Sequence, residues 1–559
     1  MALCLLSKRP AMRNLITLAT GLTLLATVAA CEAGPGSAKE PPLLTVTSPA
    51  RSTIQSQSQG GQITVTGTAL PSARGEAVAK VLVNNVEATL LPDGAFHAVI
   101  DIGPGAQLIQ TVAHGASGAT VSDTRSIQTG QLHPVGANIG RAVAAALSAD
   151  ALAKISAAAG PIIKGLDLPA MLAPMQPMVS AGDSLANFQL FVDNLKFTDI
   201  KISLVPVQGG LAFSAEITQL DVPARMKVAG ALVPDGTIAV RVTADRITVA
   251  GTLEVAPNGM AGFKTTLANP DVGITRSHLD ASGVPGAILD LFDLDSALAF
   301  VASKGAELVM GPLVNQALGA LGGPQHVDVL GHQLALQVAP SVVDFTPAGG
   351  VVELDMKALL AGSEASPGFI MTDNGAPGMD AGHGFQLGLA DDLVNELLAE
   401  LHALGTLNLS MPQAAGVFDT VQIKMTVPPM ISADAADGEM RVVLGDMYAT
   451  FTSHGTPVGK AAINARIDLK IAALVPGGSA VGLQLGTPEI HVDTLDDIAN
   501  TTGLDAGDLS KATAACIGAQ IDALTKLLVA IPLPSLAGLQ IRDLSISADD
   551  GYVMISGQL

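Results

Sequence analysis

The sequence predicts a mainly β protein with long helices, of the α+β class, and three observations lead to this. Residues 43–130 hold short alternating runs of apolar and polar residues between turn residues, with no helical pattern. A longer alternating region at 188–279 precedes apolar residues at helical spacing in 287–321. A similar order of alternating strands and a long helix returns at 407–531. We therefore expect an N-terminal β-sandwich and then two domains, each an antiparallel sheet packed on a helix.

Composition narrows the function classes. The chain is 48% apolar and 14% charged, yet after residue 31 no apolar run approaches the roughly 20 residues of a spanning helix. The apolar surplus must then fill a large core or line a lipid-sized cavity. A net charge of −21, the absence of Trp and an aromatic content of 3% argue against nucleic-acid binding.

Residues 1–31 are expected to be an export signal. Three basic residues precede a long apolar run, and small residues stand directly before Cys31. This arrangement resembles the lipobox of bacterial lipoproteins. The resemblance implies that Cys31 receives a diacylglyceryl group and anchors the protein in a membrane. Glu32 after Cys31 implies the outer membrane. Whether the protein faces the periplasm or the cell surface is not decided by the sequence. An ordinary cleaved signal is the alternative.

Residues 32–42 are predicted to be a flexible tether. In 43–130 the Asp93-Gly94 pair lies between two alternating runs, which predicts a hairpin. The order of features here is similar to the immunoglobulin-like modules of bacterial surface proteins, which implies a spacer without a ligand site. Only Cys31 and Cys516 remain after signal removal, so no structural disulfide is expected.

Residues 138–324 are expected to form the first sheet-and-helix domain. The apolar period becomes helical at residue 147, and Ser148 suits an N-cap. The apolar faces of this helix and of the helix at 287–321 should pack on the sheet between them. We predict that five residues on these faces contact an apolar ligand: Leu152, Ile155, Ile162, Leu298 and Val301.

Residues 325–361 are predicted to be strands that join two halves, and 362–559 to be the second sheet-and-helix domain. Helices are expected at 391–404 and 508–531, each with one apolar face. The predicted ligand-contacting residues of this half are Leu397, Leu401, Leu524 and Leu528.

From residue 138 onward the chain resembles the bactericidal/permeability-increasing and lipopolysaccharide-binding proteins of the tubular lipid-binding superfamily. Five stretches match in order: NIGRAVAAALSADALAKI, ISLVPVQGGLAFSAEI, TPAGGVVELDMKALLAG, LGLADDLVNELLAEL and IPLPSLAGLQIRDLSISADDGYVMISG. The resemblance implies a boomerang of two twisted antiparallel sheets, each wrapped on a helix, joined by a central sheet, with an apolar lipid pocket in each domain. The chain departs from the family in two ways. The mammalian members have a disulfide in the first domain, and this chain has no cysteine there. The antimicrobial members have a cationic tip that binds lipid A, and this chain is strongly acidic. Lipid burial is therefore expected, and endotoxin killing is not.

Motifs for catalysis or metal binding are weak. The residues 182–185 spell the GDSL signature of an esterase family and 380–383 give a later DxxH, but PMQPMVSA before the serine is not the strand that such a nucleophile needs. His326 and His332 lack a carboxylate at ligand spacing, and the aspartates at 290–295 fit a solvated helix start. We expect no catalytic residue, no metal and no cofactor.

The expected function is that of a membrane-anchored lipid-binding protein that holds or transfers phospholipid, fatty acid or another acyl-chain ligand. A surface scaffold or adhesin that uses the same fold without a transported ligand is the main alternative. A GDSL-type esterase is the third. The sequence leaves the ligand's identity, the oligomeric state and any protein partner open.

Overall fold

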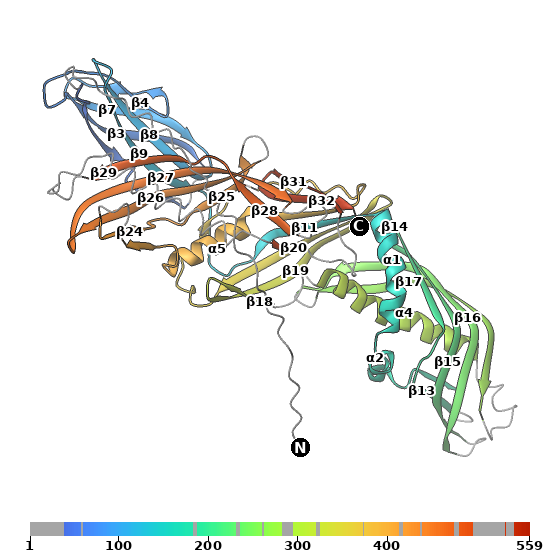
Figure 1. The fold of residues 1–559 in the computed structure, drawn as a ribbon. Coiled ribbons are helices and arrows are strands. Elements are labelled where there is room, and N and C mark those ends of the chain that lie inside the picture. The colour runs from blue at the N-terminus through green and yellow to red at the C-terminus, as the bar shows by residue number, and fades with distance from the viewer. Residues whose placement is uncertain are drawn as a thin grey trace, which may run out of the picture.

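The computed structural model describes residues 39–56, 60–182, 187–230, 235–259, 262–281, 294–319, 325–372, 374–412, 418–435, 439–473, 480–495, 531–532 and 542–558. It is 63% strand and 13% helix, in several curled antiparallel sheets, which confirms the mainly β prediction. Figure 1 shows an elongated body. Cys31, Leu524, Leu528 and the side chain of Ile162 lie outside the described residues.

The N-terminal region is a sandwich of two sheets. One has the strand order β1-β3-β7-β6, with β1 (Leu43–Ser48), β3 (Gly61–Leu70), β6 (Thr89–Leu90) and β7 (Ala95–Ile102). The other has the order β2-β9-β8-β4-β5, with β2 (Thr53–Gln55), β4 (Val78–Val83), β5 (Val86–Glu87), β8 (Gly105–Gly115) and β9 (Thr120–Thr129). Val65 and Phe96 of the first sheet meet Ile109 of the second in one buried core. Every second residue of these strands turns inward, which accounts for the alternating sequence.

A six-stranded antiparallel sheet follows. Its order is β12-β13-β15-β16-β17, with β14 paired to β15, and its strands are β12 (Val179–Gly182), β13 (Asn187–Val192), β14 (Asp199–Val207), β15 (Gly210–Ala229), β16 (Gly236–Pro257) and β17 (Phe263–Asp280). The helical segments of this region are α1 (Ala149–Lys164), α2 (Leu168–Leu172), the 3-10 turn η1 (Ala173–Met175) and α4 (Leu294–Gly319). Helix α1 packs against β14 and α4 against β17, and Figure 1 shows both beside the curled sheet.

Helix α1 begins where the sequence predicts. The Ser148 Oγ accepts a hydrogen bond from the Ala151 backbone N–H at 3.2 Å, as an N-cap does. The helix ends at Lys164. Pro169 lies in the first turn of the next helix, α2, a position that proline favours.

A seven-stranded sheet joins distant parts of the chain. Its order is β18-β19-β20-β11-β22-β32-β31, with β11 (Ile139–Ser148), β18 (Gln325–Val329), β19 (His332–Thr346), β20 (Gly349–Leu360), β22 (Phe385–Ala390), β31 (Arg542–Asp549) and β32 (Tyr552–Gln558). The strands expected at 325–361 therefore lie here together with strands that come from much earlier and much later in the chain. The strands β10 (Leu132–His133) and β21 (Phe369–Ile370) form a separate two-stranded ribbon, and Phe369 packs in one hydrophobic cluster with Ile139 of β11.

The last sheet has eight strands. Its order is β23-β24-β26-β27-β28-β30, β25 pairs with β26 and β29 with β27, and its strands are β23 (Leu409–Pro412), β24 (Thr420–Lys424), β25 (Met430–Ala435), β26 (Glu439–Ser453), β27 (Thr456–Ala473), β28 (Ala480–Leu485), β29 (Glu489–Leu495) and β30 (Ile531–Pro532). Helix α5 (Asp391–Ala403) packs against β20 and β25. Ile531, expected to end a helix, begins β30 instead, and the rest of that helix at 508–530 lies outside the described residues. Among the helices of the described ranges, none has the length and apolarity that crossing a membrane requires.

The sandwich is fixed to the eight-stranded sheet by a buried polar network. Arg51, between β1 and β2, is only 10% exposed, and its Nη1 and Nη2 atoms each lie 3.0 Å from a carboxylate oxygen, of Asp446 on β26 and of Asp493 on β29. Asp493 also accepts a hydrogen bond from the Thr124 backbone N–H at 2.9 Å, and Asn464 Nδ2 donates to the Thr124 carbonyl at 2.8 Å. Buried charges are tolerated only with such complete pairing. The sandwich is therefore a docked part of the body, unlike the spacer that its sequence implies.

The backbone of β26 is shaped to receive this contact. Asp446 has φ +41°, at a point where the register between β26 and β27 shifts, and such a conformation costs a non-glycine residue about 1–3 kcal/mol. Its Oδ2 atom accepts hydrogen bonds from the Ser52 N–H at 2.6 Å and the Ser126 N–H at 3.0 Å. A Cβ atom on the preceding Gly445 would lie 2.0 Å from the Ser126 Oγ. Only glycine therefore lets the sandwich approach so closely.

Candidate functional site

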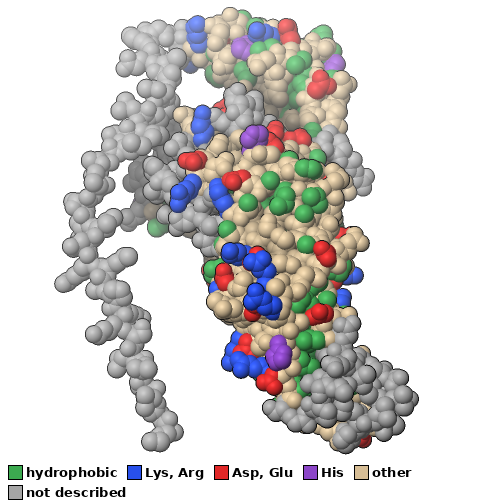
Figure 2. All heavy atoms as spheres, turned by 90° about the vertical axis from the view of Figure 1, so that its right-hand side faces the viewer, with side chains coloured by type: hydrophobic (Ala, Val, Ile, Leu, Met, Phe, Trp, Pro, Cys, Tyr) green, Lys and Arg blue, Asp and Glu red, His purple; other side chains and the backbone are tan. Residues whose placement is uncertain are grey.

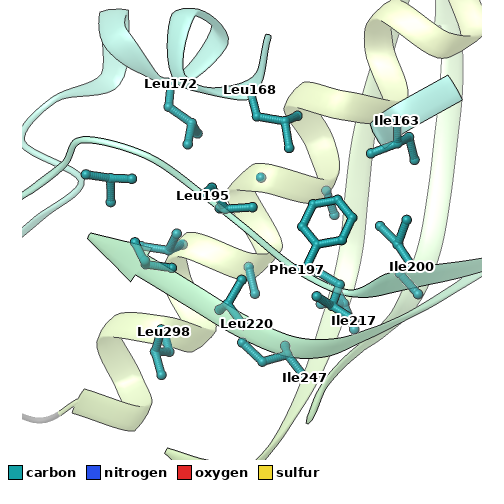
Figure 3. A pocket seen from close by; sticks show the side chains of 18 of the residues that line it. Ile163, Leu168, Leu172, Leu195, Phe197, Ile200, Ile217, Leu220, Ile247 and Leu298 are labelled. Atoms are coloured by element: carbon teal, nitrogen blue, oxygen red, sulfur yellow. The ribbon is translucent and has the colours of Figure 1, made fainter. Parts of the chain in front are cut away.

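An apolar cavity lies between the six-stranded sheet and helices α1, α2 and α4. The volume of this cavity is about 100 Å³. Figure 3 shows labelled side chains from helices and strands directed into the same space. The lining residues are all apolar: Ile163, Leu168, Met171, Leu172, Leu190, Val192, Leu195, Phe197, Ile200, Ile202, Phe213, Ala215, Ile217, Leu220, Val222, Val242, Ile247, Val249, Leu298, Val301, Ala302, Gly305, Ala306 and Met310.

Helix α4 supplies one wall and leaves the space. Leu298, Val301, Ala302, Gly305 and Ala306 recur at helical spacing, so they share the face that lines the cavity. Three of these five are Ala302, Gly305 and Ala306, which occupy little volume. Larger side chains at these positions would fill the space as a packed core does, so the small residues of α4 help to keep the cavity open.

The sheet keeps its apolar residues inward across a backbone kink. On β15 the lining residues have odd numbers up to Ile217 and even numbers from Leu220, and the change falls at Gln219, which has φ +52°. The pairing of β15 with β16 keeps the same register on both sides. Arg276 on β17 has the same φ, +52°, so the kink crosses the sheet and bends it around the cavity.

Eleven of the lining residues are half-buried, and they come from α2, the connection between β13 and β14, β14, β15 and α4. We call the part formed by α2 and by this connection, with Leu168, Met171, Leu195 and Phe197, the mouth. Deeper residues are almost fully buried, as Val242 is at 1% and Leu298 at 5% exposure. The space thus runs from an apolar rim to an apolar floor.

This geometry can hold an apolar chain and perform no acid–base chemistry. No lining residue carries a nucleophile or a titratable group. Burying a CH₂ group is worth about 0.8 kcal/mol, whereas a polar group placed here would lose its hydrogen bonds to water without replacement.

The structure brings together some of the predicted ligand-contacting residues. Leu298 and Val301 line the cavity. Leu152 is buried in the same hydrophobic cluster without reaching the cavity, and Ile155 is half-buried outside its lining. Leu401 is fully buried in the core of the eight-stranded sheet, with Leu397 packed against that core.

Sequence reasoning missed the mouth. The sequence prediction did not include α2, which spans Leu168–Leu172 and supplies Leu168, Met171 and Leu172 to the lining. A five-residue helix is too short to show a helical period, and the signal that could have found it is Asp167 as an N-cap. The Asp167 Oδ1 accepts a hydrogen bond from the Ala170 N–H at 3.1 Å, and Pro169 follows at the helix start.

Helix α5 carries a buried acidic face that the sequence pattern did not predict. Asp392, Glu396 and Glu400 are each at most 2% exposed. Burial raises the pKa of Asp392 and of Glu400 to about 7 and that of Glu396 to about 8. Each carboxyl accepts a backbone N–H from a neighbouring segment: Thr372 at 3.0 Å, Gly136 at 3.0 Å and Leu360 at 2.7 Å. These acids tie α5 to three segments, and no group of three potential ligands in the described ranges could hold a metal ion.

The described structure does not assemble a catalytic site from the GDSL and DxxH motifs. Asp183, Ser184 and Leu185 lie outside the described residues. His383 and Asp380 are joined at 2.5 Å on an exposed loop. The Gly382 N–H and His383 lower the pKa of Asp380. An exposed pair without a neighbouring nucleophile in the described structure is a surface contact.

The outer face of the six-stranded sheet carries both signs of charge. Figure 2 shows Lys and Arg interspersed with Asp and Glu on this side of the molecule. Arg225, Arg241 and Arg246 each form an ion pair with an acid: Asp193 at 2.8 Å, Asp221 at 2.7 Å and Glu216 at 3.3 Å. Their charge is thus compensated locally, which does not favour an anionic partner on this face.

A scan of protein-family models and a search of curated proteins each give no match. Among solved structures, the chain is similar to the crystal structure of a lipopolysaccharide binding protein, at 15% identity and a TM-score of 0.34, over 75% of this chain and 99% of that one. It is also similar to P47 of Clostridium botulinum E1 (11% identity, TM-score 0.26, 76% and 100% of the chains) and P47 from Clostridium botulinum A2 (10%, 0.24, 75% and 97%). These scores are too low to establish a shared fold or function.

Proposed function

We propose that this protein binds lipid and holds an acyl chain in the cavity between α1, α2, α4 and the six-stranded sheet. The observation that carries the proposal is the wholly apolar lining. An acyl chain would restore the dispersion contacts that an empty space forfeits, and each buried CH₂ adds about 0.8 kcal/mol. A polar head group would stay outside the mouth. The ligand class is therefore a phospholipid or a fatty acid.

A pair of substitutions on α4 tests this proposal. Ala302→Phe places a ring in the cavity, whereas Ser303→Phe places the same ring on the next residue, which does not line it. A fluorescent fatty acid should bind the parent and Ser303→Phe alike and Ala302→Phe at least tenfold more weakly, since a filled cavity leaves no room for the chain. Equal binding to all three proteins would refute a ligand in this cavity.

The proposal includes a lipid anchor at Cys31, which the lipobox-like sequence supports, and a place in the outer membrane. Cys31→Ala should release the protein from the membrane fraction into the aqueous fraction after cell lysis. A mutant that sediments with membranes as the parent does would show that another part of the chain holds it there.

The second candidate function is a surface scaffold or adhesin, and the docked sandwich favours it, because the Arg51 network makes a stiff connection. A scaffold would carry no acyl ligand, so the test on α4 separates the two. Catalysis is no part of the proposal, since the lining offers neither a nucleophile nor a base.

A further inference from the structure

Three leucines stand exposed at one end of the sandwich. Leu43, Leu70 and Leu91 have 55%, 42% and 45% of their surface exposed. Most large apolar side chains of this sandwich are buried in its core. A group of half-exposed leucines is therefore a feature to explain, whereas a single one is not.

The three side chains form a row on the outer face of the four-stranded sheet. Leu43 and Leu70 are directly paired across β1 and β3, so their side chains are neighbours on one face. A Cβ on Gly94 would lie 2.6 Å from the Leu70 Cδ2, and the Gly94 N–H donates to the Leu91 carbonyl at 2.9 Å. Leu70 therefore covers the turn that Leu91 begins. We call Leu43, Leu70 and Leu91 the leucine row.

The described parts of the rest of the body do not cover this row. The five-stranded sheet, on the other side of the sandwich core, is the one that docks, through Thr124 and Ser126 of β9. Figure 1 places the sandwich at one end of the molecule and helices α1 and α4 at the other.

The chain that leads to Cys31 leaves from this same end. Lys39 Nζ donates to the Ser117 carbonyl at 2.6 Å, and Glu40 accepts from the Arg74 N–H at 2.9 Å, four residues after Leu70. Cys31 lies only eight residues before Lys39. Since an extended chain covers at most about 3.6 Å per residue, an acyl group on Cys31 stays within roughly 30 Å of this end.

We propose that the leucine row is a membrane-contact surface that rests on the lipid bilayer holding the Cys31 anchor. The proposal depends on the anchoring proposed above, because the short tether is what brings this end to a bilayer. The neighbouring charges Arg74 and Glu40 lie 3.9 Å apart and offset each other, so the contact is apolar and does not need anionic head groups. With the sandwich docked, this contact places the lipid cavity at the end of the body away from the anchoring membrane.

Flotation with phosphatidylcholine vesicles tests the row, using the full chain with Cys31→Ala so that no acyl group contributes. Weak binding is expected. The double variant Leu43→Ser, Leu70→Ser should lower the partition coefficient roughly 25-fold, at about fivefold for each half-exposed leucine. Val205→Ser, which removes a 52% exposed residue of β14, is the matched control and should bind as the Cys31→Ala chain does. Circular dichroism checks that each variant is folded.

Two results would overturn the proposal. One is that the Cys31→Ala chain does not bind vesicles more strongly than the double variant does, whether both bind equally or neither binds. The other is self-association of the Cys31→Ala chain that the double variant loses while its vesicle binding stays, because the row would then join two copies of the chain. Failure of the anchor itself is read separately, from a chain that combines Cys31→Ala with Leu43→Ser and Leu70→Ser and still sediments with cell membranes as the parent does.

Discussion

Glu396→Gln should make the stability of the region around α5 much less dependent on pH. Glu396 is 1% exposed, and burial raises its pKa from 4.5 to about 8. The Gly136 and Ala358 backbone hydrogen bonds and Lys357 act in the opposite direction, while Glu400 adds to the rise. The folded protein therefore keeps this proton between about pH 4.5 and 8, whereas the unfolded chain has lost it.

The sign and size of the effect follow from proton linkage. A state that binds more protons is favoured at low pH, so stability falls as the pH rises through this window. The loss is about 1.4 kcal/mol for each pH unit and each such group, or about 2 to 3 kcal/mol for Glu396 between pH 5.5 and 7.5. Glutamine keeps an oxygen for the Gly136 N–H, which Glu396 accepts at 3.0 Å, and cannot ionise.

Urea unfolding followed by tyrosine fluorescence suits this test. The chain has no Trp and two Tyr, and these, Tyr448 on β26 and Tyr552 on β32, lie in the two sheets beside α5. The difference in unfolding free energy between pH 5.5 and 7.5 should be about 2 to 3 kcal/mol smaller in Glu396→Gln than in the parent. Glu87→Gln removes a charge at an exposed position of β5, far from the acids of α5 in the chain, and should leave that difference unchanged. The same difference in the parent and in Glu396→Gln would refute the reasoning.

Three further predictions concern the docked sandwich and the cavity. Arg51→Ala leaves Asp446 and Asp493 buried without their cation and should cost about 3–5 kcal/mol in urea unfolding, with a separate early transition for the sandwich; a loss below 1 kcal/mol would show that the network contributes little. Gly445→Ala should lower the free energy of unfolding by about 1–3 kcal/mol, because its Cβ would clash with Ser126. Gly455→Ala adds a Cβ in open space at a φ of +74°, so it measures the cost of backbone strain without a clash. Binding of a neutral phospholipid should change little between low and high salt, since no charge lines the cavity; collapse of binding at high salt would point to a charged site instead.

Local sequence patterns predicted helices and strands, whereas the order of strands in the sheets depends on pairing between segments that are far apart in the chain. Ser148 marked the start of α1, and helical spacing in α4 placed Leu298 and Val301 on the face that lines the cavity, because capping and helix faces depend on neighbours in sequence. The partners of β11 lie more than 200 residues away, at β20 and β22, so its place in the central sheet has no local signal.

Two other features depend on exceptions to simple patterns. Alternation through Leu211, Phe213 and Ile217 predicted one inward face, but the positive φ of Gln219 shifts it by one residue, which a sequence shows only as a broken period. The helical spacing of α5 predicted its apolar face and gave no sign that its acids are buried, and each of these acids accepts a backbone N–H from a segment that is distant in the chain. The docking of the sandwich through Arg51 depends on Asp446 and Asp493, which lie about 400 residues further along the chain, so no local pattern predicts it.

Native mass spectrometry of the Cys31→Ala chain, purified without detergent and used as the parent in this experiment, tests the central claim most directly. The account predicts that the parent carries one acyl-chain lipid in this cavity, that Ser303→Phe carries it too, and that Ala302→Phe loses it while remaining folded. Leu298→Glu should also lose the lipid, because a carboxylate beside the chain has no partner in the lining. A bare polypeptide mass for the parent, together with an unfolded Leu298→Glu protein, would show that these side chains form a closed core and would contradict the account.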